Sequence, residues 1–521
     1  MRTLRSIMAV AVLVPAACAT QRPSTPQPTP STAERPPVTA PAARPGPPAH
    51  GSAAISAADV QARIAFLASD AMAGRNTPSP GLEAVAQYAA AEFARFGLEP
   101  AGDSGSFIQR YPFTQASLDR SAVAFRAGAI ALAYGQDYFV VPGSADSLAG
   151  KALYVGTARA GMALPAAAAG RIIVVAVPDT LGSAESMQRW QNNVVGALQA
   201  AMGAGSAGVV AVLDPAFKGA AMQMLATMTS QQSAPLPLYG VMPAALAPAF
   251  TAADVDWAKL RASEPAAPVE LPLDFLLRTA TGRVAARVPN AVAMLPGSDP
   301  ARRGEYVVFS AHMDHVGIGR PDARGDSIFN GADDDASGTA AVIELAQAFA
   351  AQPKAPARSL IFLLVSGEEK GLLGSQYFAQ HPTVPIDSIV ADLNSDMIGR
   401  NNPDTVSAIG QEFTDMGTTV QQVARQHAAE LKLVVAPDLW PEENLFMRSD
   451  HYSFAAREVP AIFFTTGLHA DYHKPSDEPQ TIDNDKVARI ARLIYLLGEA
   501  VADGAARPQW TAAGRAKLNL H

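Results

Sequence analysis

The segment 311–338, AHMDHVGIGRPDARGDSIFNGADDDASG, concentrates side chains that can bind metal ions. An apolar run, EYVVFS, precedes it, and an alanine-rich run with helical character follows it. Carboxylates and imidazoles crowded at the end of a strand repel one another and are costly to desolvate unless a cation gathers them. The segment therefore predicts part of a metal site, with candidate ligands His312, Asp314, His315, Asp333, Asp334 and Asp335.

The cysteine content limits what kind of metal site this can be. Cys18 is the only cysteine in 521 residues, so an internal disulfide and a cysteine-based zinc site are both excluded. The ligands must be His, Asp and Glu, which select hard or borderline ions such as Zn, Co or Mn. Such a ligand set argues for a catalytic metal rather than a structural one.

The overall composition is that of a globular protein with room for more than one domain. Hydrophobic residues make up 49% and charged residues 17% of the chain, and the net charge is −8. No basic patch is present, so nucleic acid is not an expected partner. The composition carries no indication of oligomeric state.

The N-terminal residues 1–18 have the pattern of an export signal. Arg2 and Arg5 precede a short apolar stretch, and small residues precede Cys18, as in a bacterial lipobox, although Pro15 departs from that pattern. The alternative is an ordinary signal peptide in which Cys18 is incidental. Residues 19–54 are rich in Pro, Thr, Ser and Ala and predict a disordered tether. We expect an exported protein of the periplasm or cell envelope that meets a membrane only through a lipid on Cys18; the alternative location is outside the cell, as a secreted protein.

The rest of the chain divides into two predicted domains. Residues 55–116 and 288–505 predict an α/β catalytic domain, and residues 506–521 a C-terminal tail. Between them, residues 117–287 combine strand-like runs with an alanine-rich helix and predict an inserted, smaller, β-rich domain. This insert contains no histidine, so we expect it to frame substrate access rather than bind the metal.

Ligand-type side chains follow four of the predicted strands of the catalytic domain. The runs EYVVFSAH, SLIFLLVSGEE, SIVADLNSDM and AIFFTTG are nearly continuous apolar segments, as expected of strands covered on both faces. Sites in open α/β sheets form at the carboxyl ends of the strands. The side chains that we expect at this edge are His312, Asp314, Glu368, Glu369, Asp396 and those of residues 469–473.

The order of these motifs resembles that of a known enzyme family. HMDH, GADDDASG, SGEEKGLLGS, NSDMIGR, RSDH and YHKPSD resemble the signature series of the co-catalytic di-zinc aminopeptidases of metallopeptidase clan MH. That group includes bacterial leucyl-type aminopeptidases and relatives of glutamate carboxypeptidase. The resemblance implies a three-layer α/β/α zinc-peptidase fold with a mixed, mainly parallel central sheet. The insert resembles, more weakly, a protease-associated domain.

The resemblance also implies a set of metal ligands. His312 and Asp396 would bind one zinc ion, Glu369 and His473 would bind a second, and Asp334 would bridge the two. Two divalent ions held about 3.5–4 Å apart, a spacing typical of the two-metal sites of aminopeptidases, require such a bridging carboxylate.

The neighbouring residues are given supporting roles by the same resemblance. Glu368 would be the general base, and Asp314 would support His312 through its second ring nitrogen. Tyr472 is a candidate donor to the developing oxyanion, and its alternative role is packing in a loop. Arg448, Ser449, Asp450 and His451 would shape the substrate pocket or, alternatively, form a loop held by hydrogen bonds.

Several other polar residues near these motifs are not expected to be ligands. We expect His315 to be a loop residue whose hydrogen bonds are satisfied. His469 lies near the site in sequence, but His473 is the better match. Of Asp333 and Asp335, at least one is expected to order the turn rather than bind metal.

These features predict an exported zinc exopeptidase, most simply an aminopeptidase that acts on peptides. A carboxypeptidase or dipeptidase on the same scaffold is the alternative. A single-zinc glutaminyl cyclase would lack a working second site, and a receptor-like binding protein would lack a ligand or Glu368. Every one of these positions is filled in this chain.

Overall fold

A computed structural model describes residues 51–518, apart from residues 120, 144, 179–183, 217–221, 223–233, 235, 263–264, 266, 280, 320 and 323. The predicted export signal, Cys18 and the tether as far as residue 50 lie outside the described residues and stay predictions. The described chain forms two compact units, which we call the insert (residues 114–285) and the catalytic unit (residues 51–113 and 286–518). The sequence placed the insert at 117–287.

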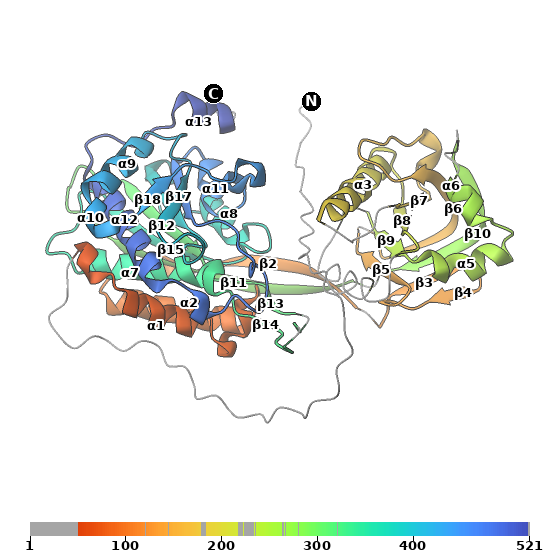
Figure 1. The fold of residues 1–521 in the computed structure, drawn as a ribbon, viewed down its shortest axis with the longest axis horizontal. Coiled ribbons are helices and arrows are strands. Elements are labelled where there is room, and N and C mark those ends of the chain that lie inside the picture. Colours follow the sequence, from red (N-terminus) through yellow and green to blue (C-terminus); the bar gives the residue numbers. More distant parts are fainter. Residues whose placement is uncertain are drawn as a thin grey trace. The chain divides into compact units, whose positions relative to one another are not determined.

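A mixed sheet forms the centre of the catalytic unit (Figure 1). Its strand order is β1-β11-β15-β12-β16-β19-β17-β18, with β2 also paired to β11. The central strands β15 (Ser359–Val365), β12 (Tyr306–His312), β16 (Ile389–Ser395) and β19 (Ala461–Thr465) are mutually parallel. The strands on either side, β11 (Thr281–Leu295) and β17 (Thr405–Ile409), run antiparallel to their central neighbours. At the edges lie β1 (Glu99–Pro100), β2 (Ile108–Leu118) and β18 (Val434–Ala436).

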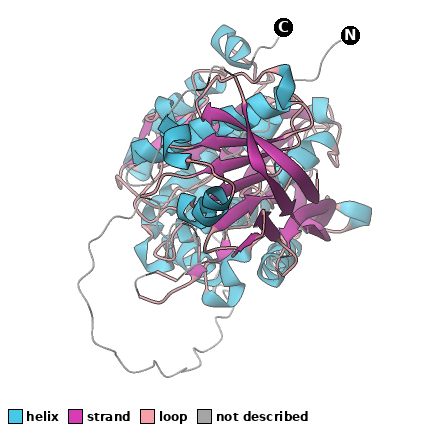
Figure 2. Ribbon diagram, turned by 90° about the vertical axis from the view of Figure 1, so that its right-hand side faces the viewer, coloured by secondary structure: helices cyan, strands magenta, loops and turns pink. Residues whose placement is uncertain are grey.

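Both faces of this sheet are covered, because alternate residues of each central strand enter different cores. In β12, Val307 and Phe309 pack in one core while Val308 packs in another. The first core includes α1 (Ala57–Leu67), α2 (Pro80–Arg95), α7 (Gly338–Ala350), α9 (Met416–Gln426) and α12 (Asn484–Asp503). The second includes Phe378 of α8 (Leu373–Gln380) and Phe454 of α11 (His451–Ala455). Figure 2 distinguishes the magenta strands from the cyan helices around them. The unit has the three-layer α/β/α fold that the sequence predicted.

Local signals in the sequence explain where the first helices begin. The Ser56 side chain accepts a hydrogen bond from the Asp59 amide at the start of α1, and Ser79 does the same for Leu82 at the start of α2. Pro80 opens α2, where its missing N–H is not needed. Together these caps fix α1 and α2 against the first core.

The insert is built on a sheet of its own. Its strand order is β4-β3-β10-β6-β7-β8-β9-β5, and β6 to β9 run parallel. The strands are β3 (Ala124–Ala127), β4 (Ile130–Leu132), β5 (Tyr138–Val141), β6 (Ser147–Thr157), β7 (Ile172–Ala176), β8 (Gly208–Val212), β9 (Leu238–Val241) and β10 (Val269–Arg278). Helices α3 (Ala184–Gly203), α5 (Pro243–Ala252) and α6 (Trp257–Ala262) complete it. Two hydrophobic cores, one on each side of the sheet, make the insert a unit with its own packing.

Two segments are more ordered than the sequence indicated. Residues Gly51–Ala54, expected at the end of the tether, form a short 3-10 helix whose Ala54 is buried in the first core. The predicted C-terminal tail contains α13 (Ala512–Leu518), and Trp510 is buried with its indole N–H donating to the Glu458 carbonyl. Both segments carry few large apolar residues, so composition alone did not reveal their packing. None of the helices within the described residues combines the length and the apolar character needed to cross a membrane.

Candidate active site

Four adjacent strand ends bring the predicted ligands together. His312 is the last residue of β12, and Asp396 directly follows β16. Glu369 lies in the turn after β15, and His473 in the loop after β19. Because these central strands are parallel, their carboxyl ends share one edge of the sheet. The fifth residue, Asp334, lies in the loop that leads into α7.

These side chains form two groups of possible metal donors that share Asp334. In the first, the Nε2 atom of His312 lies 3.2 Å from Oδ1 of Asp334 and 3.5 Å from Oδ1 of Asp396. In the second, Nε2 of His473 lies 3.1 Å from Oδ2 of Asp334 and 3.1 Å from Oε2 of Glu369. Asp334 therefore presents one carboxylate oxygen to each group, which is the arrangement a bridging ligand needs.

The donor atoms fit a metal centre because they are buried and otherwise unpaired. Nε2 of His312, Oδ1 of Asp396, Oε1 of Glu369 and Nε2 of His473 have no hydrogen-bond partner among the described residues. Buried polar atoms without partners are rare in folded proteins and destabilise them. Two cations of the Zn²⁺ class, with imidazole and carboxylate ligands, would satisfy all four atoms.

Mutual attraction between carboxylates and imidazoles dominates the electrostatics of both groups. Burial alone lowers the pKa of His473, but Glu369 and Asp334 outweigh it and raise that pKa to about 10. Burial opposes the ionisation of Glu369 as well, yet His473 and its neighbours hold its pKa at about 2. The pKa of His312 is raised well above its usual range, because Asp396 and Asp334 overcome the effect of burial. Without a metal, the imidazoles carry the positive charge that the carboxylates require; metal ions would take over that charge and displace the protons.

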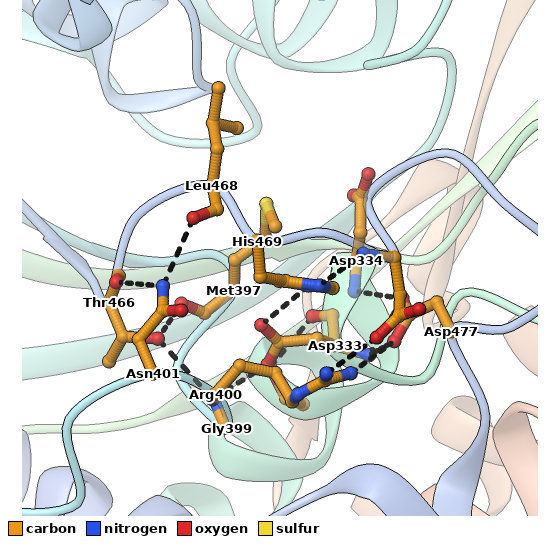
Figure 3. Close-up of polar contacts among 12 residues, drawn as sticks. Asp333, Asp334, Met397, Gly399, Arg400, Asn401, Thr466, Leu468, His469 and Asp477 are labelled. Atoms are coloured by element: carbon orange, nitrogen blue, oxygen red, sulfur yellow. Dashed lines mark hydrogen bonds and ion pairs between the residues drawn. The ribbon is translucent and has the colours of Figure 1, made fainter. Parts of the chain in front are cut away.

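A layer of hydrogen bonds holds the Asp334 loop in place (Figure 3). Asp477 accepts the backbone N–H groups of both Asp333 (3.0 Å) and Asp334 (3.2 Å) through Oδ2. Asp333 in turn accepts the Gly399 N–H at 2.6 Å, and its Oδ2 lies 3.3 Å from Nε2 of His469. His469 therefore supports the loop through Asp333, while His473 belongs to the donor group, as the sequence comparison of the two histidines favoured.

The neighbouring Asp335 orders the other side of the same loop. Its Oδ2 accepts the His312 N–H at 3.2 Å, and its Oδ1 accepts the Gly338 N–H at 2.8 Å. The carboxylate thereby ties the end of β12 to the start of α7. Both Asp333 and Asp335 serve the turn rather than a donor group.

Asp314 contacts His312 in a different way from the one expected. Nδ1 of His312 lies 3.1 Å from the backbone carbonyl of Asp314, but 3.8 Å from its carboxylate. The carboxylate instead accepts the Glu368 N–H at 3.2 Å and the Thr77 hydroxyl at 2.9 Å. The Asp314 carbonyl therefore orients the imidazole, while its carboxylate positions the backbone of Glu368.

A pocket opens beside the first donor group. Glu368 and Tyr472 line it together with Asp334 and Asp396, and neither Glu368 nor Tyr472 belongs to a donor group. Burial and the nearby Glu369, Asp450 and Asp396 raise the pKa of Glu368 well above its usual range. Tyr472 stacks on His473, with ring centroids 3.9 Å apart. The remaining walls are mostly apolar and are formed by Met397, Leu445, Arg448, Ser449, Phe463, Thr465, Gly467 and Leu468.

The four residues 448–451 divide between the pocket and the core. Arg448 and Ser449 line the pocket, and the Ser449 hydroxyl donates to Oδ2 of Asp396 at 2.8 Å. Asp450 and His451 are fully buried, and His451 packs between Phe446 and Phe463. Of the two roles considered for these four residues, lining the pocket fits Arg448 and Ser449, and a structural role in the loop fits Asp450 and His451.

The sequence of this region matches a known family. The model of Peptidase family M28 matches residues 290–497, and this stretch contains both donor groups. In this stretch the chain is similar to the peptidases of family M28.

The chain is also similar to curated proteins and to solved structures. The chain is 31% identical over 192 residues to leupeptin-inactivating enzyme 1 of Streptomyces exfoliatus, covering 37% of this chain and 38% of that protein. It is 29% identical over 252 residues to a probable zinc metalloprotease of Pyricularia oryzae, covering 40% of this chain and 48% of the relative. The chain thus spans less than half the length of these two relatives. Its fold is similar to that of an aminopeptidase from Aneurinibacillus sp. strain AM-1, with a TM-score of 0.55, 19% identity, and coverage of 88% of this chain and 96% of the other.

One prediction about this site is wrong. His315 was expected to be a loop residue with satisfied hydrogen bonds, but neither of its ring nitrogens has a hydrogen-bond partner among the described residues. Its Nδ1 lies 2.8 Å from Oε1 of Glu369, and the residue belongs to the second donor group. Sequence spacing could not show this, because the direction of the ring depends on residues distant in the chain.

Two supporting residues were not anticipated from the sequence. Arg75 is fully buried and donates to the carbonyls of Met313 (2.8 Å) and Gly331 (2.9 Å), which flank the donor groups. The Thr77 hydroxyl joins Asp314 to the Gly367 N–H, at 3.1 Å from the latter. Both lie in AGRNTPSP, a polar stretch between two helices, where the arginine before a proline-rich turn was the available signal.

Proposed function

We propose that the protein is a two-zinc exopeptidase that acts as an aminopeptidase, removing N-terminal residues from peptides. One observation carries the proposal. Asp334 presents one oxygen to each of two donor groups, while Glu368, a carboxyl group that belongs to neither, lines the pocket beside them. A shared carboxylate with an adjacent free one is the arrangement that two-metal peptide hydrolysis requires. The match of residues 290–497 to the model of Peptidase family M28 supports the same reaction.

Each part of the site has a place in this reaction. Bound zinc ions would polarise the scissile carbonyl and acidify a water molecule. Glu368 accepts the proton of that water as the new C–O bond forms, and delivers it to the amine nitrogen as the C–N bond breaks. Tyr472 faces the same pocket, and burial raises the pKa of its hydroxyl well above the usual range, so it stays protonated and can donate to the developing oxyanion.

The shape and charge of the pocket support an apolar N-terminal residue. Met397, Leu445, Phe463 and Leu468 provide apolar walls for the substrate side chain. Asp334, Glu368 and Asp396 lie at the same pocket and give it the negative charge that attracts a free α-amino group. A peptide with a free amine and a leucine-like first residue is therefore the expected substrate.

Replacing the general base tests this proposal directly. We expect Glu368→Gln to keep two zinc ions per chain but to lower kcat for leucine p-nitroanilide by about a hundredfold to ten-thousandfold, the usual contribution of a general base. Metal content by atomic emission and steady-state kinetics measure the two effects. Glu430→Gln, a change at an exposed glutamate outside the pocket, is the matched control and is expected to behave as wild type.

Two results would contradict the proposal. Full activity in Glu368→Gln would remove Glu368 from the chemistry, and activity in a metal-free protein would remove the metals. Comparison of a free peptide with its N-acetylated form tests the exopeptidase class. An aminopeptidase cleaves only the free form, whereas a carboxypeptidase on this scaffold would cleave both.

A further inference from the structure

The buried imidazole of His315 has no part in the reaction proposed above. The residue lies in the loop that follows β12, three positions after the ligand His312, and its side chain is 0% exposed. Its Nδ1 approaches Oε1 of Glu369 at 2.8 Å and Oδ2 of Asp334 at 3.6 Å. Neither ring nitrogen has a hydrogen-bond partner among the described residues. A buried imidazole without partners is costly, so its position requires a reason.

The spacing of the four donors in this second group is that of a single metal site. Four ligand atoms placed tetrahedrally at zinc distances of about 2.0–2.2 Å lie about 3.3–3.6 Å from one another. The separations in the group are 2.8 Å and 3.6 Å from His315, and 3.1 Å and 3.1 Å from His473, to oxygens of Glu369 and Asp334. Nδ1 of His315 and Oε1 of Glu369 are therefore close enough to bind the same ion, and both atoms lack a hydrogen bond of good geometry among the described residues.

Contacts within the fold fix the backbone on both sides of the His315 ring. Gly331 leaves room for the imidazole, since a Cβ atom there would lie 2.5 Å from Cγ of His315. The His315 N–H donates to the Arg75 carbonyl at 3.3 Å, and the Arg75 guanidinium binds the carbonyls of Met313 and Gly331. The ring direction is therefore set by the fold and not by chance contact with Glu369.

We propose that Nδ1 of His315 is a fourth protein ligand of the metal position formed by Asp334, Glu369 and His473. The inference rests on the two-zinc centre of the proposed function. It implies that the two metal positions differ in their number of protein ligands. Among the described residues, the second position has four protein donors, whereas the first has three: His312, Asp334 and Asp396. Zinc sites with four protein ligands are closed and hold the ion tightly, whereas sites with three keep a place for water or substrate.

The location of the pocket agrees independently with this division. Asp396, which belongs only to the three-donor position, lines the pocket, as does the shared Asp334. His315, Glu369 and His473 are not among the described residues that line it, and neither is His312. The three-donor position is therefore the one with a carboxylate of its own at the pocket, and the four-donor position would hold the second ion and the shared Asp334 in place.

Two substitutions at His315 separate metal binding from a positioning role. His315→Ala removes the imidazole. His315→Asn places an amide near the position of Nδ1, where it can still donate a hydrogen bond to Glu369 but is a poor zinc ligand. The matched control is His451→Phe, a change at a buried imidazole outside both donor groups. Each purified protein is stripped of metal and titrated with zinc alone against a chromophoric chelator.

The expected result is loss of the tighter of the two zinc affinities. Wild type and His451→Phe should bind two zinc ions with unequal affinity. Both His315 variants should bind the tighter ion at least about a hundredfold more weakly, beyond the usual effect of disturbing a group that merely supports a ligand. Normal affinity in His315→Asn would show that the residue only positions Glu369, and would overturn the inference.

X-ray absorption at the zinc edge gives a readout that a merely structural role would not change. With His312, His315 and His473 as ligands, the wild-type protein carries three imidazoles over two zinc ions, and His315→Asn carries two. Two imidazoles over two ions in the wild type would overturn the inference about His315 and leave the proposed function intact. A protein that binds no zinc would overturn both.

Discussion

His451 is held as an uncharged imidazole by the aromatic rings around it. It is fully buried, and its ring centroid lies 5.0 Å from that of Phe446 and 4.9 Å from that of Phe463. Burial in this apolar setting lowers the pKa of His451 to about 3. His473 is also buried, but its pKa is raised rather than lowered, because the carboxylates around it stabilise the charged form.

The lowered pKa makes His451 a source of acid sensitivity. Between about pH 6.5, where an unfolded histidine titrates, and about pH 3 the unfolded state binds more protons than the folded state, so stability falls as the pH falls. At pH 5 this loss is about 2 kcal/mol relative to neutral pH. Phenylalanine can replace the imidazole between the two aromatic rings and does not titrate. We therefore expect the His451→Phe variant to lose about 2 kcal/mol less stability than the wild type between neutral pH and pH 5. Urea unfolding of both proteins at pH 7.5 and pH 5 measures the difference, and equal losses would contradict the assignment.

At the level of single residues, the sequence indicates those features of the site that follow from the order of the motifs. The apolar strands placed His312, Glu369 and Asp396 at one edge of the sheet, and the resemblance to the di-zinc aminopeptidases implied that these residues and His473 are ligands. The fold brings all four into the two donor groups. His315 could not be assigned, because the direction of its ring depends on Gly331 and Arg75. Its contact with Glu369 exists only in the folded protein.

At the scale of elements, a single buried cation joins three helices of the catalytic unit. Arg63 of α1 donates to Glu344 of α7 and to both Tyr88 and Glu92 of α2, each at 2.6 Å. Arg63 and Glu344 are 2% and 1% exposed, so the buried Glu344 carboxylate depends on Arg63 for charge compensation. This contact aligns α7, whose N-terminal loop carries Asp334, with the rest of the layer.

Removing the arginine should therefore destabilise the helical layer. We expect Arg63→Met to lower the free energy of unfolding by about 3–5 kcal/mol, the usual effect of leaving one buried charge unpaired. A double variant with Glu344→Met removes the stranded carboxylate and should recover most of that loss. Urea unfolding compares the three proteins, and a double variant no more stable than the single one would show that packing, rather than charge, causes the effect.

The sequence revealed those elements that are buried on all sides and missed those that are buried only in part. The strands β12, β15, β16 and β19 were predicted because strands covered on both faces are apolar throughout. The tail helix α13 and the segment Gly51–Ala54 were not, because each contributes only a few contacts to cores built by other elements. Trp510 and Ala54 are the residues that anchor them.

On the scale of the whole molecule, the metal chemistry and the insert belong to different units. Every residue of both donor groups lies in the catalytic unit, which has hydrophobic cores of its own. The insert has two further cores formed by its own residues. The chain enters the insert through β2 and leaves it through β11, and these two strands pair with each other.

This arrangement predicts that the catalytic unit works without the insert. Replacing residues 119–280 with a short Gly-Ser linker would join the ends of β2 and β11, which are already paired, as a hairpin. We expect the shortened protein to bind two zinc ions and to hydrolyse leucine p-nitroanilide, a substrate small enough to need only the pocket, within about tenfold of the wild-type kcat/KM, a change of about 1.4 kcal/mol or less. Glu368→Gln in the shortened protein is the control that assigns the remaining activity to this site.

Loss of zinc binding by a shortened protein that still unfolds cooperatively would show that the insert helps to build the metal centre. Retained binding with altered turnover of longer peptides would instead assign the insert to substrate access.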